Sequence, residues 1–387
     1  MTSHPTVADV VALVDRSYEP ATAESWDAVG LVTGDPQAPV RRILLAVDPV
    51  QSVIDEAVAW GADLLLVHHP LLLAPVSTVA ATTPKGRAVQ SLVRGGVALL
   101  VAHTNADAPE GGVSEAMARA LGLVDLRPLE PRPAAALDKV VAFVPTEHAE
   151  RLVDALAGAG AGRLGDYERC AFISTGTGTF VPVAGARPAV GEIGHVAEVP
   201  ESRVEMVLPR LQRAAVLAAL RAVHPYEEPA FDLLELAEVA GESGHGRIGE
   251  LEEPMPLRDF VDRVVAGLPA NASGARVAGD LDAVVRTVAV CGGSGDFLLD
   301  RVRRSGADVY VTSDLRHHPV SEFREHESAP ALVDVPHWAA EATWLPVAEQ
   351  RLQAGFAEQG TTVETRVSTV VTDPWTSLAP MNSRSTH

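Results

Sequence analysis

Short apolar runs alternate with amphipathic stretches along most of this 387-residue chain. The runs at 43–47, 64–67 and 97–102 are almost wholly apolar. Uninterrupted apolar runs of this length are typical of strands buried on both faces, and helices between such strands make them parallel. The pattern therefore predicts an α/β fold.

The N-terminal segment has the pattern of an amphipathic helix, with Val7, Val10, Val11 and Val14 on one face. It lacks the basic start and the cleavable apolar run of a signal peptide. No segment of the chain approaches the roughly 18 unbroken apolar residues of a membrane helix. We therefore expect a cytoplasmic protein that does not associate with a membrane.

An internal repeat relates two parts of the chain. Residues 41–70 and 285–315 each contain an apolar strand, a loop, an amphipathic helix, the tripeptide Gly-Ala-Asp and a second apolar strand. The following strand repeats as well, because 97–107 aligns without gaps on 331–341. The agreement of these signatures in one order predicts two related α/β lobes.

The segment between the two lobes follows a different pattern. Its strands and helices are predicted in the order β-α-β-β-α-β, which is that of a ferredoxin-like α+β domain. Proline-rich 127–138 and glycine-rich 235–250 have the composition of linkers around it, and TGTGTF at 175–180 that of a flexible loop. The predicted domains are a first α/β lobe at 1–130, an inserted domain at 138–238, a second α/β lobe at 246–374 and a disordered tail at 375–387.

Charge and cysteine content restrict the classes of function. A formal net charge of −20 leaves no surplus of Lys or Arg to displace counterions from phosphates, so we expect no nucleic-acid partner. Cys170 and Cys291 lie far apart in apolar contexts, which favours buried free thiols in a reducing cytoplasm over a disulfide framework. The acidity also suits the recruitment of metal cations.

Three pairs of potential metal ligands follow predicted strands. The pairs are His68 and His69, His103 and Asp107, and His337 and Glu341. In open α/β sheets, ligands bind outside the carboxyl ends of the strands. The spacing of four in the two later pairs places both side chains on one face of a helical turn. Imidazole and carboxylate together suit zinc, iron or manganese better than calcium or magnesium.

Adjacent histidines that diverge at the end of a strand can each bind a different metal ion, and a carboxylate can bridge both ions. The pattern therefore predicts a two-metal centre whose bridging water loses its proton near neutral pH and becomes a nucleophile. A single buried histidine is more often a hydrogen-bonded structural residue than a ligand. The prediction therefore rests on the six residues together.

Two further motifs have weaker patterns. CGGSGDF at 291–297 lies between a strand and a helix, and its backbone amides could surround a phosphate, although a tight turn explains its glycines equally well. His317-His318-Pro319 is similar to the first histidine pair but follows a polar stretch. An exposed loop is therefore favoured there over a role beside the metal ligands.

Five motifs occur in an order that is specific to one family. They are ESWDAVGLVTGD (24–35), VHHPLLL (67–73), HTNADAPEGGVSEAMA (103–118), CGGSGDFLL (291–299) and the terminal H-x-x-x-E (337–341). Together they resemble the NGG-interacting-factor-three-like family, whose members are labelled GTP cyclohydrolase 1 type 2 homologues or dinuclear metal centre hexameric proteins. The inserted segment, with HPYEEPAFDLL, resembles the PII/CutA-like domain of longer members.

The resemblance implies two similar lobes, a homohexameric toroid and two divalent metal ions per subunit. The ligands that it implies are His68, His69, Asp107, His337 and Glu341. Glu341 would be the bridge between the ions. For His103 the resemblance implies either a place behind the ligands or a catalytic role as a proton shuttle.

The activity implied by the resemblance is that of a metal-dependent hydrolase acting on a nucleotide. With GTP, metal-bound hydroxide would open the imidazole ring of guanine and formate would leave. His103 would move the proton, and either the Ser294–Gly295 turn or Arg316 would hold phosphate. Two alternatives stay open, namely a two-metal nucleotide phosphoesterase and a non-enzymatic metal-binding regulatory or metal-handling oligomer.

Overall fold

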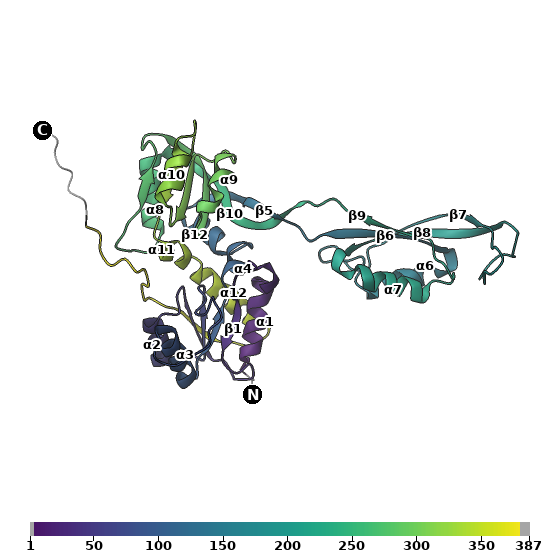
Figure 1. Cartoon of the computed structure of the whole chain (residues 1–387), viewed down its shortest axis with the longest axis horizontal. Helices are drawn as coiled ribbons and strands as arrows, with labels where there is room; N and C mark the ends of the chain where they lie inside the picture. Colours follow the sequence, from purple (N-terminus) through teal and green to yellow (C-terminus); the bar gives the residue numbers. More distant parts are fainter. Residues whose placement is uncertain (1–3, 380–387) are drawn as a thin grey trace. The chain divides into compact units, whose positions relative to one another are not determined.

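The computed structural model describes residues 4–379 of the chain. Its contacts divide the chain into two compact units, one formed by residues 1–132 and 242–387 and the other by Pro133–Gly241 (Figure 1). Within the predicted disordered tail, 375–379 form no helix or strand, and 380–387 lie outside the described residues. No described helix is both long and apolar enough to span a membrane.

The first unit contains two sheets, and the first sheet has the strand order β1-β4-β3-β2-β15. Its strands are β1 (Gly30–Thr33), β2 (Arg42–Ala46), β3 (Leu64–Val67), β4 (Ala98–Val101) and β15 (Glu364–Val367). β15, β2, β3 and β4 are parallel, and β1 is antiparallel to β4. The prediction of parallel strands connected by helices is confirmed in this lobe.

Helices cover both faces of the first sheet. They are α1 (Val7–Ser17) and α12 (Leu345–Glu358) on one face, and α2 (Gln51–Trp60) and α3 (Pro84–Gly95) on the other. In β3, Leu64 and Leu66 pack on the α1 side, whereas Leu65 and Val67 pack on the α2 side. All four side chains are buried, so β3 has no polar face until it ends.

The second sheet has the strand order β11-β14-β13-β12-β10-β5. Its strands are β5 (Leu123–Pro133), β10 (Ala240–Pro256), β11 (Arg276–Ala278), β12 (Val284–Ser294), β13 (Val309–Ser313) and β14 (Ala331–Asp334). β12, β13 and β14 are parallel, and β10 and β11 are antiparallel to their neighbours β12 and β14. This sheet is also covered on both faces.

The remaining helices of the unit are η1 (Pro20–Thr22), α4 (Thr104–Asp107), α5 (Val113–Ala120), α8 (Leu257–Gly267), η4 (Asp296–Leu298), α9 (Leu299–Arg303), α10 (His317–Arg324) and α11 (His337–Ala342).

The internal repeat is visible in equivalent hydrogen bonds. The carboxylate of Asp63 accepts from the backbone N–H groups of Arg41 and Arg42 at the start of β2. In the second copy, the carboxylate of Asp308 accepts from the N–H groups of Arg286 and Thr287 in β12. The aspartate of each Gly-Ala-Asp phrase therefore ties its strand to the preceding one, and the prediction of two related lobes is confirmed.

The lobes exchange segments, so the sheets do not follow the predicted boundaries at 130 and 246. β15, near the C-terminus, joins the first sheet, and β5 joins the second. α5 belongs to the first lobe by sequence, yet its buried residues pack in the core of the second sheet. The exchange builds the two lobes into one continuous unit, because each sheet needs a strand from the other half of the sequence.

The second unit has the predicted ferredoxin-like topology. Its elements are β6 (Leu137–Pro145), η2 (Thr146–His148), α6 (Ala149–Gly158), β7 (Phe172–Phe180), β8 (Ala197–Pro209), η3 (Arg210–Gln212), α7 (Arg213–Val223) and β9 (Phe231–Glu235). The antiparallel sheet has the order β7-β8-β6-β9, and α6 and α7 pack together on it around a single core.

The two cysteines of the chain were predicted as buried free thiols. Cys170 and Cys291 are free thiols, but only Cys291 is buried, whereas Cys170 is half-buried.

Three segments that were predicted as irregular are strands. The proline-rich stretch forms much of β5 at the edge of its sheet, where prolines are tolerated because the missing N–H groups need no partner. The glycine-rich stretch forms much of β10, in which a Cβ on Gly249 would lie 2.6 Å from the carbonyl of Val124 in β5. TGTGTF belongs to β7 and pairs with β8 from Ala197 onward. Tertiary pairing overrides composition in each case.

Candidate metal centre

The carboxyl ends of strands from both sheets place the candidate ligands. β3 ends at Val67, so His68 and His69 leave the sheet at that point. β4 ends two residues before His103, and α4 carries Asp107 one turn further on. In the other lobe, α11 begins at His337 after β14 and carries Glu341 on its second turn. Side chains from these three strand ends, two in one lobe and one in the other, contact one another.

All six predicted residues lie in one cluster around Glu341. Its Oε1 lies 2.8 Å from Nε2 of His337 and 3.5 Å from Nε2 of His68, and its Oε2 lies 3.0 Å from Nε2 of His69. Nε2 of His68 also lies 3.5 Å from Oδ1 of Asp107. The side chain of Glu341 is 4% exposed, so this carboxylate contacts three imidazoles away from bulk water.

His103 belongs to the same cluster. One ligand atom from each of His68, His69 and His103 lies within 4.8 Å of the others, and the same holds for His69, His337 and Glu341. Because His69 belongs to both groups, the cluster consists of two adjoining ligand sets. This arrangement is what a pair of neighbouring metal ions requires.

Each of the four histidines is oriented by a hydrogen-bond acceptor on its Nδ1. Nδ1–H donates to the carbonyl of Ala102 in His68, to Asp48 in His69, to Asp27 in His103 and to Asp314 in His337, over 2.7–2.9 Å. A carbonyl or a carboxylate can only accept, so Nδ1 carries a proton in every ring and Nε2 is the atom left for a ligand. Carboxylates and carbonyls behind the imidazoles are the usual outer partners of metal-binding histidines.

The three outer aspartates were not predicted as functional residues. Asp27 lies within the ESWDAVGL motif, and Asp48 follows the first strand of the repeat, but nothing in their local sequence points to a histidine. Asp314 is the equivalent of His69 in the second copy of the repeat. It adopts a φ of 57°, a conformation that aspartate tolerates better than most residues, and it contacts His337. The repeat was therefore a signal that could have identified it.

Two observations test whether the cluster fits metal ions. Nε2 of His68 is buried and has no hydrogen-bond partner, although buried polar atoms are normally paired. A Cβ on Gly293, which has a φ of 71°, would lie 2.7 Å from Oε1 of Glu341. An unpaired ring nitrogen therefore faces the Glu341 carboxylate, and the absence of a side chain at Gly293 leaves room beside this carboxylate. The three imidazoles of His68, His69 and His337 and the two carboxylates of Asp107 and Glu341 form a donor set that suits zinc, iron or manganese.

The ionisable groups of the cluster shift one another's pKa values. Burial by itself lowers the pKa of a histidine, but the Glu341 carboxylate and the outer aspartates raise the pKa to about 10 in His69 and to about 9 in His337. Burial opposes ionisation of Glu341 too, yet the surrounding imidazoles hold the pKa of this carboxyl well below its usual range. Without a cation, the cluster therefore retains protons that a metal ion must displace.

The pKa values of Asp107 and His103 are shifted in the opposite direction to those of Glu341 and of the other histidines described above. Burial raises the pKa of Asp107 to about 6. Burial and the nearby His68 together lower the pKa of His103, despite its hydrogen bond to Asp27. His103 is therefore the imidazole of the cluster that is neutral near pH 7 and ready to accept a proton.

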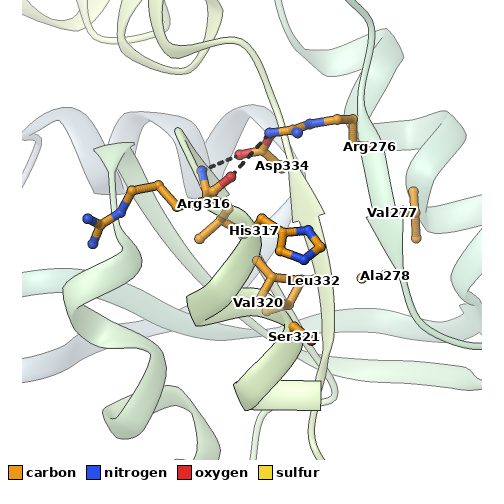
Figure 2. A pocket seen from close by; sticks show the side chains of 10 residues that line it. Arg276, Val277, Ala278, Arg316, His317, Val320, Ser321, Leu332 and Asp334 are labelled. Atoms are coloured by element: carbon orange, nitrogen blue, oxygen red, sulfur yellow. Dashed lines mark hydrogen bonds and ion pairs between the residues drawn. The ribbon is translucent and has the colours of Figure 1, made fainter. Parts of the chain in front are cut away.

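The second histidine pair lies elsewhere. His317 and His318 are exposed at the start of α10, so the prediction of exposure is confirmed, whereas the predicted loop is the first turn of a helix. His317 lines a pocket of about 350 Å³ that shares no lining residue with the cavity at the cluster. Figure 2 shows His317 in this pocket with Val320 and Leu332. Neither histidine joins a described group of potential metal ligands.

The arginines beside that pocket are engaged in ion pairs. Arg276 is paired with Asp334, as Figure 2 shows, and Arg316 is paired with Asp296. Arg316, which was predicted as a possible phosphate ligand, does not line the cavity at the histidine cluster, whereas Ser294 does.

The fold and the cluster define a class, namely two-lobed α/β proteins with a candidate dinuclear metal centre. The chain belongs to the family described as Duf34/NIF3 (NGG1p interacting factor 3), whose model matches residues 5–374. The resemblance to the NGG-interacting-factor-three-like family is thereby confirmed.

Relatives of similar length support the family assignment. A Mycobacterium tuberculosis protein is 50% identical over 370 residues, covering 95% of this chain and 96% of the relative. A Halalkalibacterium halodurans protein is 38% identical over 368 residues, covering 95% and 97%. Both are named "GTP cyclohydrolase 1 type 2 homolog".

Solved structures agree with this fold. A crystal structure of a Bacillus cereus protein related to NIF3 matches with a TM-score of 0.78 and 35% identity, covering 97% of this chain and 100% of that chain. A Staphylococcus aureus protein matches with a TM-score of 0.84 and 26% identity, covering 97% and 99%.

Proposed function

We propose that this chain is a dinuclear metal-dependent hydrolase that acts on a nucleotide, with GTP as the candidate substrate. The observation that carries the proposal is the set of four imidazoles, each with Nδ1–H bound to a fixed acceptor, gathered with two carboxylates at one place. The names of the relatives support GTP as the first substrate to test.

Five of the residues would bind the metal ions, and His103 would transfer protons. His68, His69, Asp107, His337 and Glu341 would hold two divalent ions, with Glu341 between them. Such ions supply Lewis acidity and lower the pKa of water at the site. His103 would serve as the proton acceptor through Nε2, because its Nδ1–H is bound to Asp27 and its lowered pKa keeps the ring neutral near pH 7. With GTP, hydrolysis at C8 of the guanine ring would release that carbon as formate.

The experiment is a product assay with a matched control. Full-length protein loaded with zinc, iron or manganese is incubated with GTP, and formate and phosphate are measured separately. Glu341→Gln should abolish turnover, whereas Glu358→Gln, at an exposed position on α12, should leave it unchanged. Formate release supports the cyclohydrolase. Phosphate release without formate supports the alternative of a two-metal nucleotide phosphoesterase, which would use the same ligands.

A non-enzymatic metal-binding regulator is the second candidate, and the inserted unit favours it. The ferredoxin-like unit has its own core and is separate from the unit that carries the cluster. We propose that it is a PII/CutA-like module and that the chain assembles as a homohexamer in the cytoplasm. Light scattering should then give about six times the chain mass of 40.7 kDa. Stoichiometric metal with no turnover over a nucleotide panel would select the regulator.

A further inference from the structure

A cavity of about 490 Å³ opens onto the histidine cluster within the first unit. All the candidate metal-site residues except His68 line it. A volume of this size lies within the range that accommodates a small organic ligand. The part of the cavity beyond the cluster includes Glu24, Trp26, Glu130, His245 and Phe297.

Two exposed aromatic side chains line this outer part, one from each lobe. Trp26, in the loop before β1, is 57% exposed, and Phe297, in η4, is 58% exposed. Each ring meets a histidine edge-on. The Trp26 and His103 centroids are 6.0 Å apart at 78°, and those of Phe297 and His245 are 5.5 Å apart at 88°. The edge contacts fix the rings while leaving ring surface free to stack on a planar ligand.

The charged groups of the outer cavity are mainly acceptors. Glu24 is paired with Arg132 and lies 3.5 Å from Nε2 of His245. Glu130 is exposed at the cavity. No Lys or Arg is among the described residues that line the cavity. With Glu24 paired to Arg132, Glu130 is left as the carboxylate that can accept from N–H donors in the outer part.

We propose that this cavity binds a planar heteroaromatic ring, stacked on Trp26 and Phe297, with N–H donors on the ring edge directed at Glu130. The proposal deepens the proposed function and rests on it, because the bound ring would lie beside the hydrolytic cluster. Guanine fits this chemistry, since N1–H and the 2-amino group are adjacent donors that one carboxylate accepts together. The cavity would recognise the base, and the phosphates would remain outside it.

The first test measures binding of guanosine to the zinc-loaded full-length protein by calorimetry. Guanosine should bind, and ribose should not displace it. Trp26→Ala and Phe297→Ala should each weaken binding by about 5- to 100-fold, the usual effect of removing one aromatic stacking partner from a base. Trp26→Phe should retain most of the affinity. Phe172→Ala is the matched control, because Phe172 is 64% exposed, lies in β7 of the second unit and does not line this cavity.

The second test concerns the ring edge. Inosine lacks the 2-amino group, so wild-type protein should prefer guanosine, and Glu130→Gln should bring the ratio of the two affinities close to one. Glu358→Gln should leave this ratio unchanged. The proposal is refuted if guanosine does not bind at millimolar concentration. Wild-type affinity in folded Trp26→Ala and Phe297→Ala would refute it equally.

The two assays distinguish failure of the ring-binding proposal from failure of the proposed hydrolase activity. Calorimetry needs no turnover, so guanosine binding through Trp26 and Phe297 without formate or phosphate release would retain the ring subsite and remove the hydrolase. GTP turnover that is unchanged in Trp26→Ala and Phe297→Ala would retain the hydrolase and remove the subsite.

Discussion

Replacing Arg247 with methionine tests whether a buried guanidinium fixes the turn that carries Asp107. Arg247 lies in β10 and is 2% exposed. It donates to the carbonyls of Gly244 and Gly246 at 2.9 Å, of Ala108 at 2.9 Å and of Pro109 at 2.8 Å, and its Nε lies 3.5 Å from Oε2 of Glu115. Two of these carbonyls follow Asp107 directly, so the guanidinium holds the backbone of a candidate ligand.

The magnitude follows from the groups that the substitution leaves behind. A buried acceptor without a partner costs about 1–3 kcal/mol. Glu115 keeps its ion pair with Arg119 at 2.7 Å, and the carbonyls of Ala108 and Pro109 each keep a backbone N–H donor, so the carbonyls of Gly244 and Gly246 set most of the cost. We expect Arg247→Met to lower the free energy of unfolding by about 2–6 kcal/mol, which is the cost of two such acceptors. Loss of a group that supports a ligand should weaken metal binding by about 10- to 100-fold.

Urea unfolding followed by circular dichroism measures the first effect, and chelator competition measures the second. Arg286→Met is the matched control, because Arg286 is 62% exposed and pairs with Glu250 at the surface, where an ion pair contributes at most about 1 kcal/mol. Arg247→Lys should fall between, since an ammonium group cannot span both pairs of carbonyls. If Arg247→Met matches Arg286→Met in stability and metal affinity, the reasoning is wrong.

Three further outcomes are expected. Asp314→Asn replaces an acceptor of the Nδ1–H of His337 with a weaker one and should lower metal affinity by about 10- to 100-fold in the same chelator competition, with little change in the melting temperature of the metal-free protein. Gly293→Ala should greatly weaken metal binding because its Cβ would approach Glu341, whereas Gly306→Ala, with a φ of 82° and nothing within 4 Å, carries only the backbone strain and should leave metal binding intact. In the metal-free protein, the native pKa of His69 is raised from 6.5 to about 10, so the stability it contributes is fully present below pH 6.5 and declines as pH rises toward 10, and a series of thermal melts over this range should fall accordingly.

Much of the fold follows from the sequence because its strands are buried on both faces. Leu64 to Val67 contribute alternately to two cores, which is why the run is apolar without interruption. The Gly-Ala-Asp repeat also corresponds to a repeated set of hydrogen bonds, made by Asp63 and Asp308. β5 and β10 were missed because their proline and glycine content depends on a neighbouring strand that local patterns do not reveal.

The candidate site was predictable only in its inner part. His68, His69 and the two later pairs stand at strand ends, where sheet topology brings side chains together. The outer partners Asp27 and Asp48 were not predictable, because each accepts a hydrogen bond from a histidine that is distant in the sequence and is brought close only by the fold. Asp314 could have been identified from the repeat, because the alignment of the two copies places it opposite His69.

The central claim is that five residues from two lobes hold two metal ions beside His103. Anomalous diffraction from crystals of the metal-loaded protein, recorded on both sides of the absorption edge of the metal, tests it most directly. The account predicts two separate peaks per chain, both at the cluster, with Glu341 contacting both ions. A single peak, peaks at other residues or no peak in metal-loaded crystals would contradict it.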